Sequence, residues 1–365
     1  MPATPLIRRL RRAAAGAVCA AAVALPFSFA SAGAAQAAQT PQVAGFTSLT
    51  LLNGWENTAY GTAHPQVRLV SGIVQFKGAM ATSGTNPLAF TLPKAFRPGT
   101  IAYVPVDLCG SAEGRLVVEP NGNVIVDVQD QFSDAQCFTS LDGASFAKSA
   151  GLFTLLPLRN GWKNGPFSTS RAAVRVINGI VHLKGAISTK GTNPIPFILP
   201  KGFRPASNTY VNVDLCNSNN GRLFIQTSGK VTVNAERSWA DAQCFTSLDG
   251  ATFARSASRF TALKLLHGWK NRAFATAPAG VRNVSGAIEF RGAMSTKGTN
   301  ALPFTLPKAF RPSRDVYIPV DLCNAHYGRL FIQPTGLVTV QVNVETSAWS
   351  DAQCFTSLEG ASFLK

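Results

Sequence analysis

The octapeptide QCFTSLDG, residues 136–143, recurs at residues 243–250 and, with Glu359 in place of the aspartate, at residues 353–360. Upstream, an NGW or HGW tripeptide ends at Trp55, Trp162 and Trp269, in steps of 107 residues. Repeats of solenoid proteins are about 20 to 50 residues long, so a period of this length belongs to a whole domain that owns a core. The sequence therefore predicts three tandem copies of one domain.

The three domains are expected at residues 44–148, 151–255 and 258–365. Only 14% of the residues are charged, whereas 31 are glycine and 22 are proline, a composition typical of short strands joined by tight turns. Valines alternate with polar residues, as at Val338, Val340, Val342 and Val344. Such alternation indicates strands with one buried and one solvated face. We therefore predict an all-β chain of three tandem antiparallel β-sandwiches of the jelly-roll kind.

A β-hairpin is expected within each copy. In the first copy, Arg115 to Val118 forms an apolar run, Val124 begins another, and the turn sequence PNGN, residues 120–123, lies between them. Asn-Gly readily adopts the left-handed backbone that a two-residue turn needs, and the other copies keep the glycine as Gly229 and Gly336.

The first 37 residues have the features of a signal peptide. Four arginines between residues 8 and 12 precede the apolar stretch 13–24, which is too short to cross a bilayer. The sequence AQA, residues 35–37, suits a cleavage site, and ASA, residues 30–32, is the second choice. No later apolar segment is long enough for membrane insertion. We expect a protein that is secreted and released outside the cell.

The charge of the chain suggests anionic partners. The formal net charge is +16, and removal of the four leader arginines, which no nearby acidic residue offsets, lowers it to +12. Cell-wall polymers, acidic polysaccharides, phospholipid head groups and nucleic acid are all attracted by such a surface. Nucleic acid is the least favoured, because the aromatic and basic residues form no known recognition motif.

Six cysteines remain after the leader, two in each copy. Each pair flanks the predicted hairpin, so both members should meet at its open end and form three structural disulfides, Cys109–Cys137, Cys216–Cys244 and Cys323–Cys354. Closing a loop of about 28 residues stabilises a fold by roughly 3 to 4 kcal/mol in the chain-entropy model. The third copy has three additional residues between its cysteines, which a bulge or the loop before Trp349 must absorb.

We expect neither catalysis nor a metal or other cofactor. The four histidines do not occupy equivalent positions, so the copies share no histidine base or ligand, and each cysteine pair is too widely spaced for a zinc site. Three carboxylates recur, Asp107, Asp134 and Asp142 in the first copy. They could supply an acid and a base, but aspartates beside turns and basic residues are more often caps or ion-pair partners.

Recurring aromatic and basic side chains are the candidates for ligand binding. Phe132, Trp239 and Trp349 share an aligned place before the second cysteine, and exposed rings there would stack on the apolar face of a sugar. Burial in the core is the alternative, and it is favoured for Trp55, Trp162 and Trp269. The basic candidates are Lys94, Lys201 and Lys308. The arginines three residues further on, Arg97, Arg204 and Arg311, are expected to hydrogen-bond loop carbonyls or a recurring aspartate, a role that is favoured over binding an anionic ligand.

The segments GIVHLKG, residues 179–185, and FILPKGFRP, residues 197–205, resemble the terminal head domains of bacteriophage tail fibres. The resemblance implies a small β-sandwich, often trimeric, that contacts glycans or proteins on a host surface. The export signal, the cysteine pairs and the three copies in one chain depart from that pattern. The last departure suggests that the copies imitate the phage trimer within one polypeptide.

The sequence as a whole favours a secreted, non-catalytic binding protein. Its three similar modules would engage a glycan or an anionic surface polymer with avidity. The alternatives are a secreted structural or protein-interaction protein and, less favoured, a secreted hydrolase. A glycan binder should expose Phe132, Trp239 and Trp349, whereas a structural module should bury them.

Overall fold

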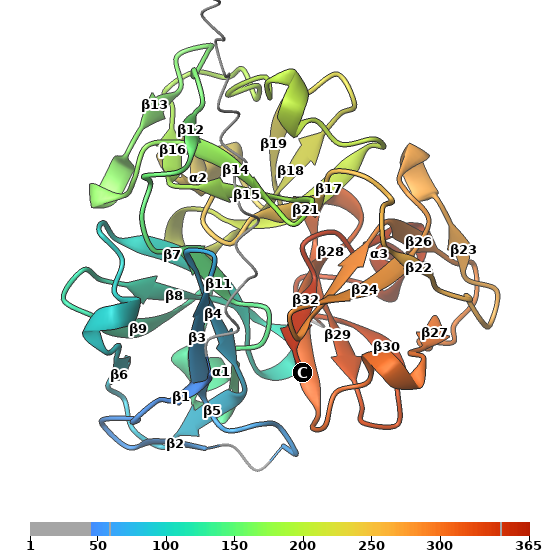
Figure 1. The fold of residues 1–365 in the computed structure, drawn as a ribbon, viewed down its shortest axis with the longest axis horizontal. Coiled ribbons are helices and arrows are strands. Elements are labelled where there is room, and N and C mark those ends of the chain that lie inside the picture. The colour runs from blue at the N-terminus through green and yellow to red at the C-terminus, as the bar shows by residue number, and fades with distance from the viewer. Residues whose placement is uncertain (1–44, 58–59, 344) are drawn as a thin grey trace, which may run out of the picture. The chain divides into compact units, whose positions relative to one another are not determined.

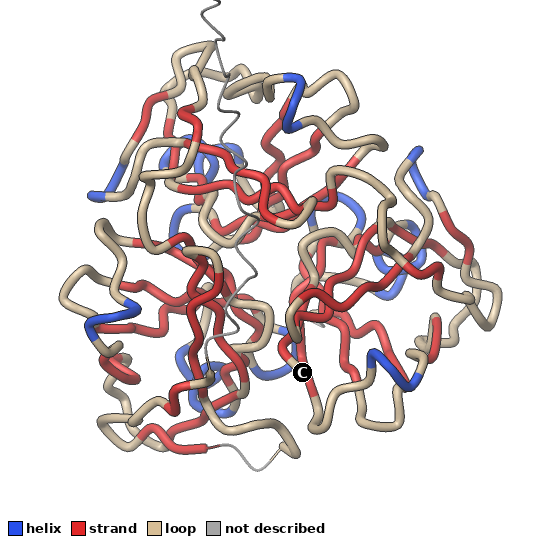
Figure 2. Tube along the Cα trace, in the orientation of Figure 1, coloured by secondary structure: helices blue, strands red, loops and turns tan. Residues whose placement is uncertain are grey.

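The computed structural model describes residues 45–365 except 58–59 and 344 (Figure 1). The predicted signal peptide, residues 1–37, lies outside the described residues. Strand predominates over helix (Figure 2), and the sheets are antiparallel. The expectation of a mostly β chain is therefore confirmed at this level. The three copies are called repeat 1 (residues 45–148), repeat 2 (151–255) and repeat 3 (258–365).

The described part of repeat 1 contains three sheets, with strand orders β1-β3-β4-β11, β10-β5-β2 and β6-β9-β8-β7. The strands are β1 (Thr47–Ser48), β2 (Trp55–Asn57), β3 (Gln66–Val70), β4 (Ile73–Lys77), β5 (Ala79–Thr82), β6 (Leu88–Thr91), β7 (Ala102–Asp107), β8 (Glu113–Val118), β9 (Asn123–Val128), β10 (Thr139–Ser140) and β11 (Ser145–Ala147).

Repeat 2 has the sheets β12-β14-β15-β21, β13-β16-β20 and β17-β18-β19. Its strands are β12 (Thr154–Leu155), β13 (Lys163–Asn164), β14 (Ala173–Ile177), β15 (Ile180–Lys184), β16 (Ala186–Ser188), β17 (Thr209–Asp214), β18 (Asn220–Ile225), β19 (Val231–Ala235), β20 (Thr246–Ser247) and β21 (Thr252–Ala254).

Repeat 3 has the sheets β22-β24-β25-β32, β23-β26-β31 and β27-β30-β29-β28. Its strands are β22 (Thr261–Ala262), β23 (Lys270–Asn271), β24 (Gly280–Val284), β25 (Ala287–Arg291), β26 (Ala293–Ser295), β27 (Phe304–Thr305), β28 (Val316–Asp321), β29 (Tyr327–Ile332), β30 (Leu337–Val342), β31 (Thr356–Ser357) and β32 (Ser362–Leu364).

Each repeat has a hydrophobic core of its own, within residues 55–146, 156–253 and 263–363. The alternating valines supply it as predicted. Val124 and Val126 of β9, and Val338 and Val340 of β30, are buried, whereas the residues between them are partly exposed. Val344, which continues the pattern in the sequence, lies outside the described residues.

The predicted hairpin is present, with a longer turn than expected. Val118 of β8 pairs with Val124 of β9. The Glu119 N–H donates to the Asn123 carbonyl, and the Gly122 N–H donates to the Glu119 carbonyl, both at 2.9 Å. The turn therefore has three central residues, and only Gly122, at φ 100°, has the left-handed backbone. Pro120 favours this arrangement because its fixed φ suits the first position of the turn.

Three short α-helices were not predicted: α1 (Phe132–Cys137), α2 (Trp239–Cys244) and α3 (Trp349–Cys354). Each helix ends at the second cysteine of its repeat, and the disulfides Cys109–Cys137, Cys216–Cys244 and Cys323–Cys354 are formed as predicted. The insertion of repeat 3 leaves the β29–β30 register intact, so it is taken up between β30 and α3.

Neighbouring repeats are joined by equivalent ion pairs. Arg115 of repeat 1 pairs with Asp214 of repeat 2 at 3.2 Å, Arg222 of repeat 2 with Asp321 of repeat 3 at 3.5 Å, and Arg329 of repeat 3 with Asp107 of repeat 1 at 3.0 Å. The three aspartates are almost completely buried. Because the third pair returns to the first repeat, the contacts form a closed ring of three.

Further contacts follow the same cyclic order. The hydroxyls of Ser247, Ser357 and Ser140 donate to the carbonyls of Tyr103, Tyr210 and Tyr317, each at 2.7 Å and each in another repeat. The strands that carry these tyrosines, β7, β17 and β28, contact one another (Figure 1). One strand from each repeat thus meets the other two within the compact unit formed by the described chain.

We predict that Arg329→Met lowers the free energy of unfolding by about 3 to 5 kcal/mol, because it leaves the carboxylate of Asp107 buried without its partner. Urea denaturation measures the change. The control is Arg237→Gln, which breaks an exposed ion pair with Asp130 and should cost less than about 1 kcal/mol. Adding Asp107→Asn to Arg329→Met should recover part of the loss. Equal, small losses in Arg329→Met and in the control would contradict the prediction.

We also predict that the protein is more stable at pH 5 than at pH 8. Desolvation by burial raises the pKa of Asp107 and Asp249 to about 6, and that of Asp142, Asp214, Asp321 and Glu359 to about 7. The folded state then binds protons more tightly than the unfolded state, so stability rises as the pH falls through 7 to 5.

One histidine opposes this trend. Desolvation lowers the pKa of His182 to about 4, so the unfolded state takes up a proton there below about pH 6.5. The six carboxyl groups together change the stability with pH more than the one imidazole does, so the protein should still be more stable at pH 5. Melting temperatures across pH 5 to 8 test the sign, and Asp142→Asn, which keeps the acceptor for the Gly78 N–H, should flatten the profile. A melting temperature that increases towards pH 8 would refute this account.

Candidate functional site

The predicted aromatic candidates are the first residues of the three helices, and they are half-buried. Phe132, Trp239 and Trp349 pack against the cores of their repeats. Their rings lie edge to face with Trp55, Trp162 and Trp269, at centroid distances of 6.3, 6.0 and 6.1 Å. The three partner tryptophans are buried, as expected. Much of the surface of each candidate ring is therefore used for packing.

The polar atoms of these indoles have internal partners as well. Trp239 donates from Nε1 to the Gly191 carbonyl and Trp349 to the Gly298 carbonyl, each at 3.2 Å. Such bonds connect the start of the helix to the loop that follows β16 or β26, the middle strand of the three-stranded sheet β13-β16-β20 or β23-β26-β31. These rings consequently stabilise the fold, and only their exposed part is accessible to a ligand.

The predicted lysines are exposed but lie elsewhere on each repeat. Lys94, Lys201 and Lys308 begin short 3₁₀ helices, η1 (Lys94–Phe96), η4 (Lys201–Phe203) and η7 (Lys308–Phe310). In repeat 1, η1 packs against β3, whereas α1 packs against β5 and β9. The structure thus does not bring the predicted aromatic and basic candidates together into one site.

The arginines near these lysines are structural, as predicted. Arg97, Arg204 and Arg311 donate from Nε to the carbonyls of Leu92, Leu199 and Leu306 at 2.8 to 2.9 Å. The hairpin glycine sits against the same groups, because a Cβ at Gly122 would lie 2.5 Å from Arg97 Nε. A side chain at this glycine would therefore disturb the loop.

A more exposed aromatic set was missed in the sequence. Tyr60, Phe167 and Phe274 are 51%, 57% and 57% exposed, and they occupy equivalent positions because each lies 107 residues from the next. The available signal was this spacing together with a recurring Asn-x-x-(Tyr/Phe)-x-Thr pattern around each ring, whose asparagines are Asn57, Asn164 and Asn271. Tyr60 additionally approaches the sulfur of Cys137, at 3.5 Å from its hydroxyl.

The backbone beneath two of these rings is strained. Phe167 and Phe274 both have φ of 54°, and the residues after them, Ser168 and Ala275, have φ of 61°. Left-handed backbone is rare for bulky residues, and such conformations cluster at functional sites. The loops η3 (Pro166–Ser168) and η6 (Ala273–Ala275) hold an apolar ring in solvent at a cost in stability.

Each exposed ring begins a row of aromatic side chains that crosses from one repeat to the next. Phe167 lies 5.7 Å from Phe245, which lies 4.8 Å from Tyr103 of repeat 1. The equivalent rows are Phe274, Phe355 and Tyr210, and Tyr60, Phe138 and Tyr317. We call each set an aromatic row.

An ion-paired guanidinium lies over the tyrosine at the inner end of each aromatic row. Arg115, Arg222 and Arg329 lie over the rings of Tyr103, Tyr210 and Tyr317 at 4.9 to 5.0 Å, a cation–π geometry. The same guanidinium groups make the ion pairs between repeats. Every aromatic row therefore lies at a junction of two repeats, and its outermost ring faces solvent.

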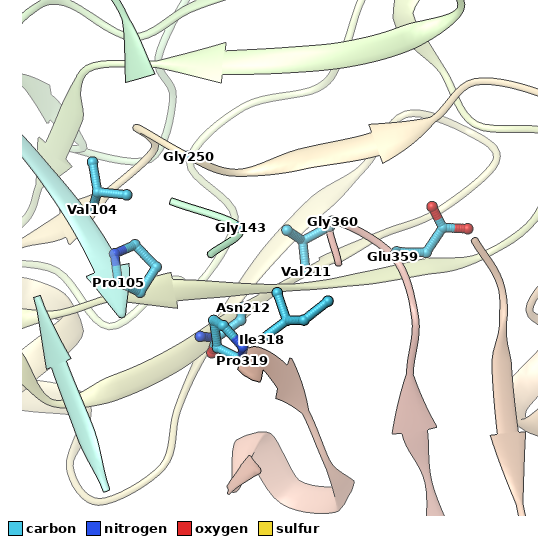
Figure 3. A pocket seen from close by; sticks show the side chains of 10 residues that line it. All are labelled: Val104, Pro105, Gly143, Val211, Asn212, Gly250, Ile318, Pro319, Glu359 and Gly360. Carbon is cyan, nitrogen blue, oxygen red and sulfur yellow. The ribbon is translucent and has the colours of Figure 1, made fainter. Parts of the chain in front are cut away.

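The tyrosine strands also line a small central cavity (Figure 3). Val104, Val211 and Ile318 come from equivalent positions, as do Gly143, Gly250 and Gly360. The cavity has a volume of about 30 Å³, which is enough for a water molecule and too small for a sugar ring. This cavity is not a site for an organic ligand.

Two of the three recurring carboxylates of repeat 1 have structural partners. Asp107 pairs with Arg329, and Asp142 accepts the Gly78 N–H at 3.1 Å. Within the described part of the chain, no three His, Cys, Asp or Glu side chains cluster in a way that suits a metal ion. None of the helices in the described residues has the length and apolar character needed to span a membrane.

Comparisons of the chain with protein-family models, curated proteins and solved structures gave no match. The resemblance to phage tail-fibre head domains therefore stays a prediction. The arguments for function rest on the geometry of the rows and junctions.

We predict that Phe167→Gly is more stable than Phe167→Ala by about 1 kcal/mol, because glycine avoids the penalty of a left-handed backbone. Chemical denaturation of the two variants gives the difference. Phe224, a half-buried ring of β18 without a positive φ, is the control, and there the alanine variant should be the more stable. If the alanine variant were the more stable one at position 167 as well, the backbone of Phe167 would not be strained.

Proposed function

We propose that the protein is a non-catalytic extracellular binding protein whose three aromatic rows engage the sugar units of a surface polymer. The observation that carries the proposal is the set of three equivalent rings, Tyr60, Phe167 and Phe274, each more than half exposed. An exposed apolar ring matches the C–H face of a pyranose. A strained loop beneath two of the rings indicates that their exposure is maintained against a cost in stability.

Three equivalent sites in one chain favour a repetitive ligand. Once one row has bound a polymer, the other two meet it at high local concentration, so the overall affinity exceeds that of a single site. The lysines at residues 94, 201 and 308 add positive charge at other exposed positions, which suits a polymer that also carries anionic groups.

An extracellular location is part of the proposal. Three disulfides are compatible with an oxidising compartment, and the first 37 residues have the composition of a signal peptide. We further propose that each repeat is a sandwich related to the jelly rolls of phage receptor-binding heads. The cyclic contacts between repeats support the idea that one chain imitates a trimer of such heads.

A secreted structural or protein-interaction protein is the second candidate. The half-burial of Phe132, Trp239 and Trp349 favours it, because these rings were expected to be free in a glycan binder. Rings that pack edge-on against buried tryptophans are typical of a core boundary.

The proposal predicts that the chain without residues 1–37 binds members of a panel of neutral glycans and cell-wall polymers. The triple variant Tyr60→Ala/Phe167→Ala/Phe274→Ala should weaken polymer binding on the order of 100-fold, because all three rows are lost together. Single variants should weaken binding less, and short oligosaccharides should bind more weakly than the polymer. Binding is measured across a range of salt concentrations, because stacking persists where ion pairing is screened.

The variant Trp239→Ala/Trp349→Ala is the comparison. It should lower stability, since both rings pack on a core, and retain binding wherever the protein stays folded. Loss of binding in this variant alone would move the site to the helices. Absence of binding to every glycan and polymer would favour the structural alternative.

A further inference from the structure

A cavity of about 320 Å³ lies where the end of repeat 2 meets the start of repeat 3. Its walls carry three arginines, Arg255, Arg259 and Arg282, two serines, and the turn at Asn178 and Gly179. No acidic residue is among the lining residues. Its volume is roughly ten times that of the central cavity, so it has room for a polyatomic ion.

Arg282 forms the buried wall of this cavity. The residue belongs to β24 and is 4% exposed. Its Nε donates to Glu289 Oε2 at 2.6 Å, and its guanidinium lies 4.6 Å from the ring centroid of Phe260. Its Nη2 is buried and has no hydrogen-bond acceptor among the described residues. A buried guanidinium N–H without an acceptor is costly, and an anion in the cavity would remove that cost if a small side-chain movement brought the two into contact.

The equivalent arginines of the other repeats show what is missing here. Arg68 donates from Nη1 to the Ser285 carbonyl at 2.9 Å, and Arg175 donates from Nη1 to the Ser71 carbonyl at 3.1 Å. Each bond reaches the turn of the neighbouring repeat. Within the described residues Arg282 makes no such bond, although its Nη1 lies near the equivalent turn, 3.6 Å from a Cβ built on Gly179.

The other two arginines distinguish this junction from the one before it. One repeat earlier, Lys148 and Leu152 stand where Arg255 and Arg259 stand here. Both arginines are exposed, and Arg255 donates to the Gly202 carbonyl at 3.3 Å, which leaves further N–H groups for a ligand. The net charge beside the cavity is positive, because within the described part of the chain Glu289 is the single acidic ion-pair partner of the three arginines.

We propose that this cavity binds a tetrahedral oxoanion, a phosphate or a sulfate, either free or as an ester on a surface polymer. Guanidinium groups bind such oxygens in bidentate geometry, and the hydroxyls of Ser256 and Ser258 can donate to the remaining oxygens. The buried Arg282 would supply the fixed donor, and the exposed pair would close over the anion. This inference does not depend on the aromatic rows.

Inorganic phosphate and inorganic sulfate are the probes. Calorimetric titration of the chain without residues 1–37 should detect one site, and either anion should raise the melting temperature above that in chloride of equal ionic strength. Arg255→Ala/Arg259→Gly should weaken binding at least tenfold. Both positions are exposed, and residue 259 has φ of 67°, which glycine tolerates, so this variant should fold.

The control removes two positive charges away from the cavity. Arg171→Ala/Lys264→Ala changes two exposed residues and should keep the wild-type affinity. A preference between phosphate and sulfate would identify the type of ester. Absence of anion binding, or equal losses in the two double variants, would overturn the proposal. The aromatic triple variant should retain anion binding, so failure of one proposal is distinguishable from failure of the other.

Discussion

Three buried carboxylates, those of Asp107, Asp214 and Asp321, each depend on a guanidinium that another repeat supplies. A buried charge without its partner is strongly destabilising, so no repeat can keep its aspartate ionised and buried unless its neighbour is in place. Desolvation raises the pKa of all three carboxyl groups even with the arginine present, which shows how little solvent reaches them. Because the third pair returns to the first repeat, three copies satisfy every aspartate, whereas an open chain of repeats would leave one without a partner at its end.

The same arginines determine where the aromatic rows lie. Arg115, positioned by its bond to Asp214, covers Tyr103, and Tyr103 in turn receives the edge of Phe245 from repeat 2. The hydroxyl of Ser247 donates to the Tyr103 carbonyl and holds the two repeats together at this point. The exposed ring of Phe167 is then held at the outer end of a rigid row rather than on a free loop. Structural stability and the proposed binding surface therefore arise from one set of contacts.

Local and short-range features could be predicted from the sequence, and contacts between repeats could not. The hairpin follows from alternating valines and a turn glycine, and the disulfides follow from the position of cysteines around it. Three helices were missed because six residues that begin with Phe132 or Trp239 show no helical periodicity. The partner of Arg115 in repeat 2 lies 99 residues away, and no local pattern indicates it. The exposure of Phe167 depends on a strained loop and on a neighbouring repeat, neither of which composition shows.

Differences between the copies show why three repeats in one chain are not equivalent to three identical chains. Glu113, Asn220 and Tyr327 occupy equivalent, buried positions, and they are chemically unlike. Asn220 donates to the Ala325 carbonyl and Tyr327 to the Val106 carbonyl, while burial raises the pKa of Glu113 well above its usual range. A trimer of identical chains would bury three copies of one residue there, and three glutamates would repel one another if charged. Fusion into one polypeptide lets each position differ between the repeats. Arg255 and Arg259, at the junction of repeats 2 and 3, are a second example of such a difference.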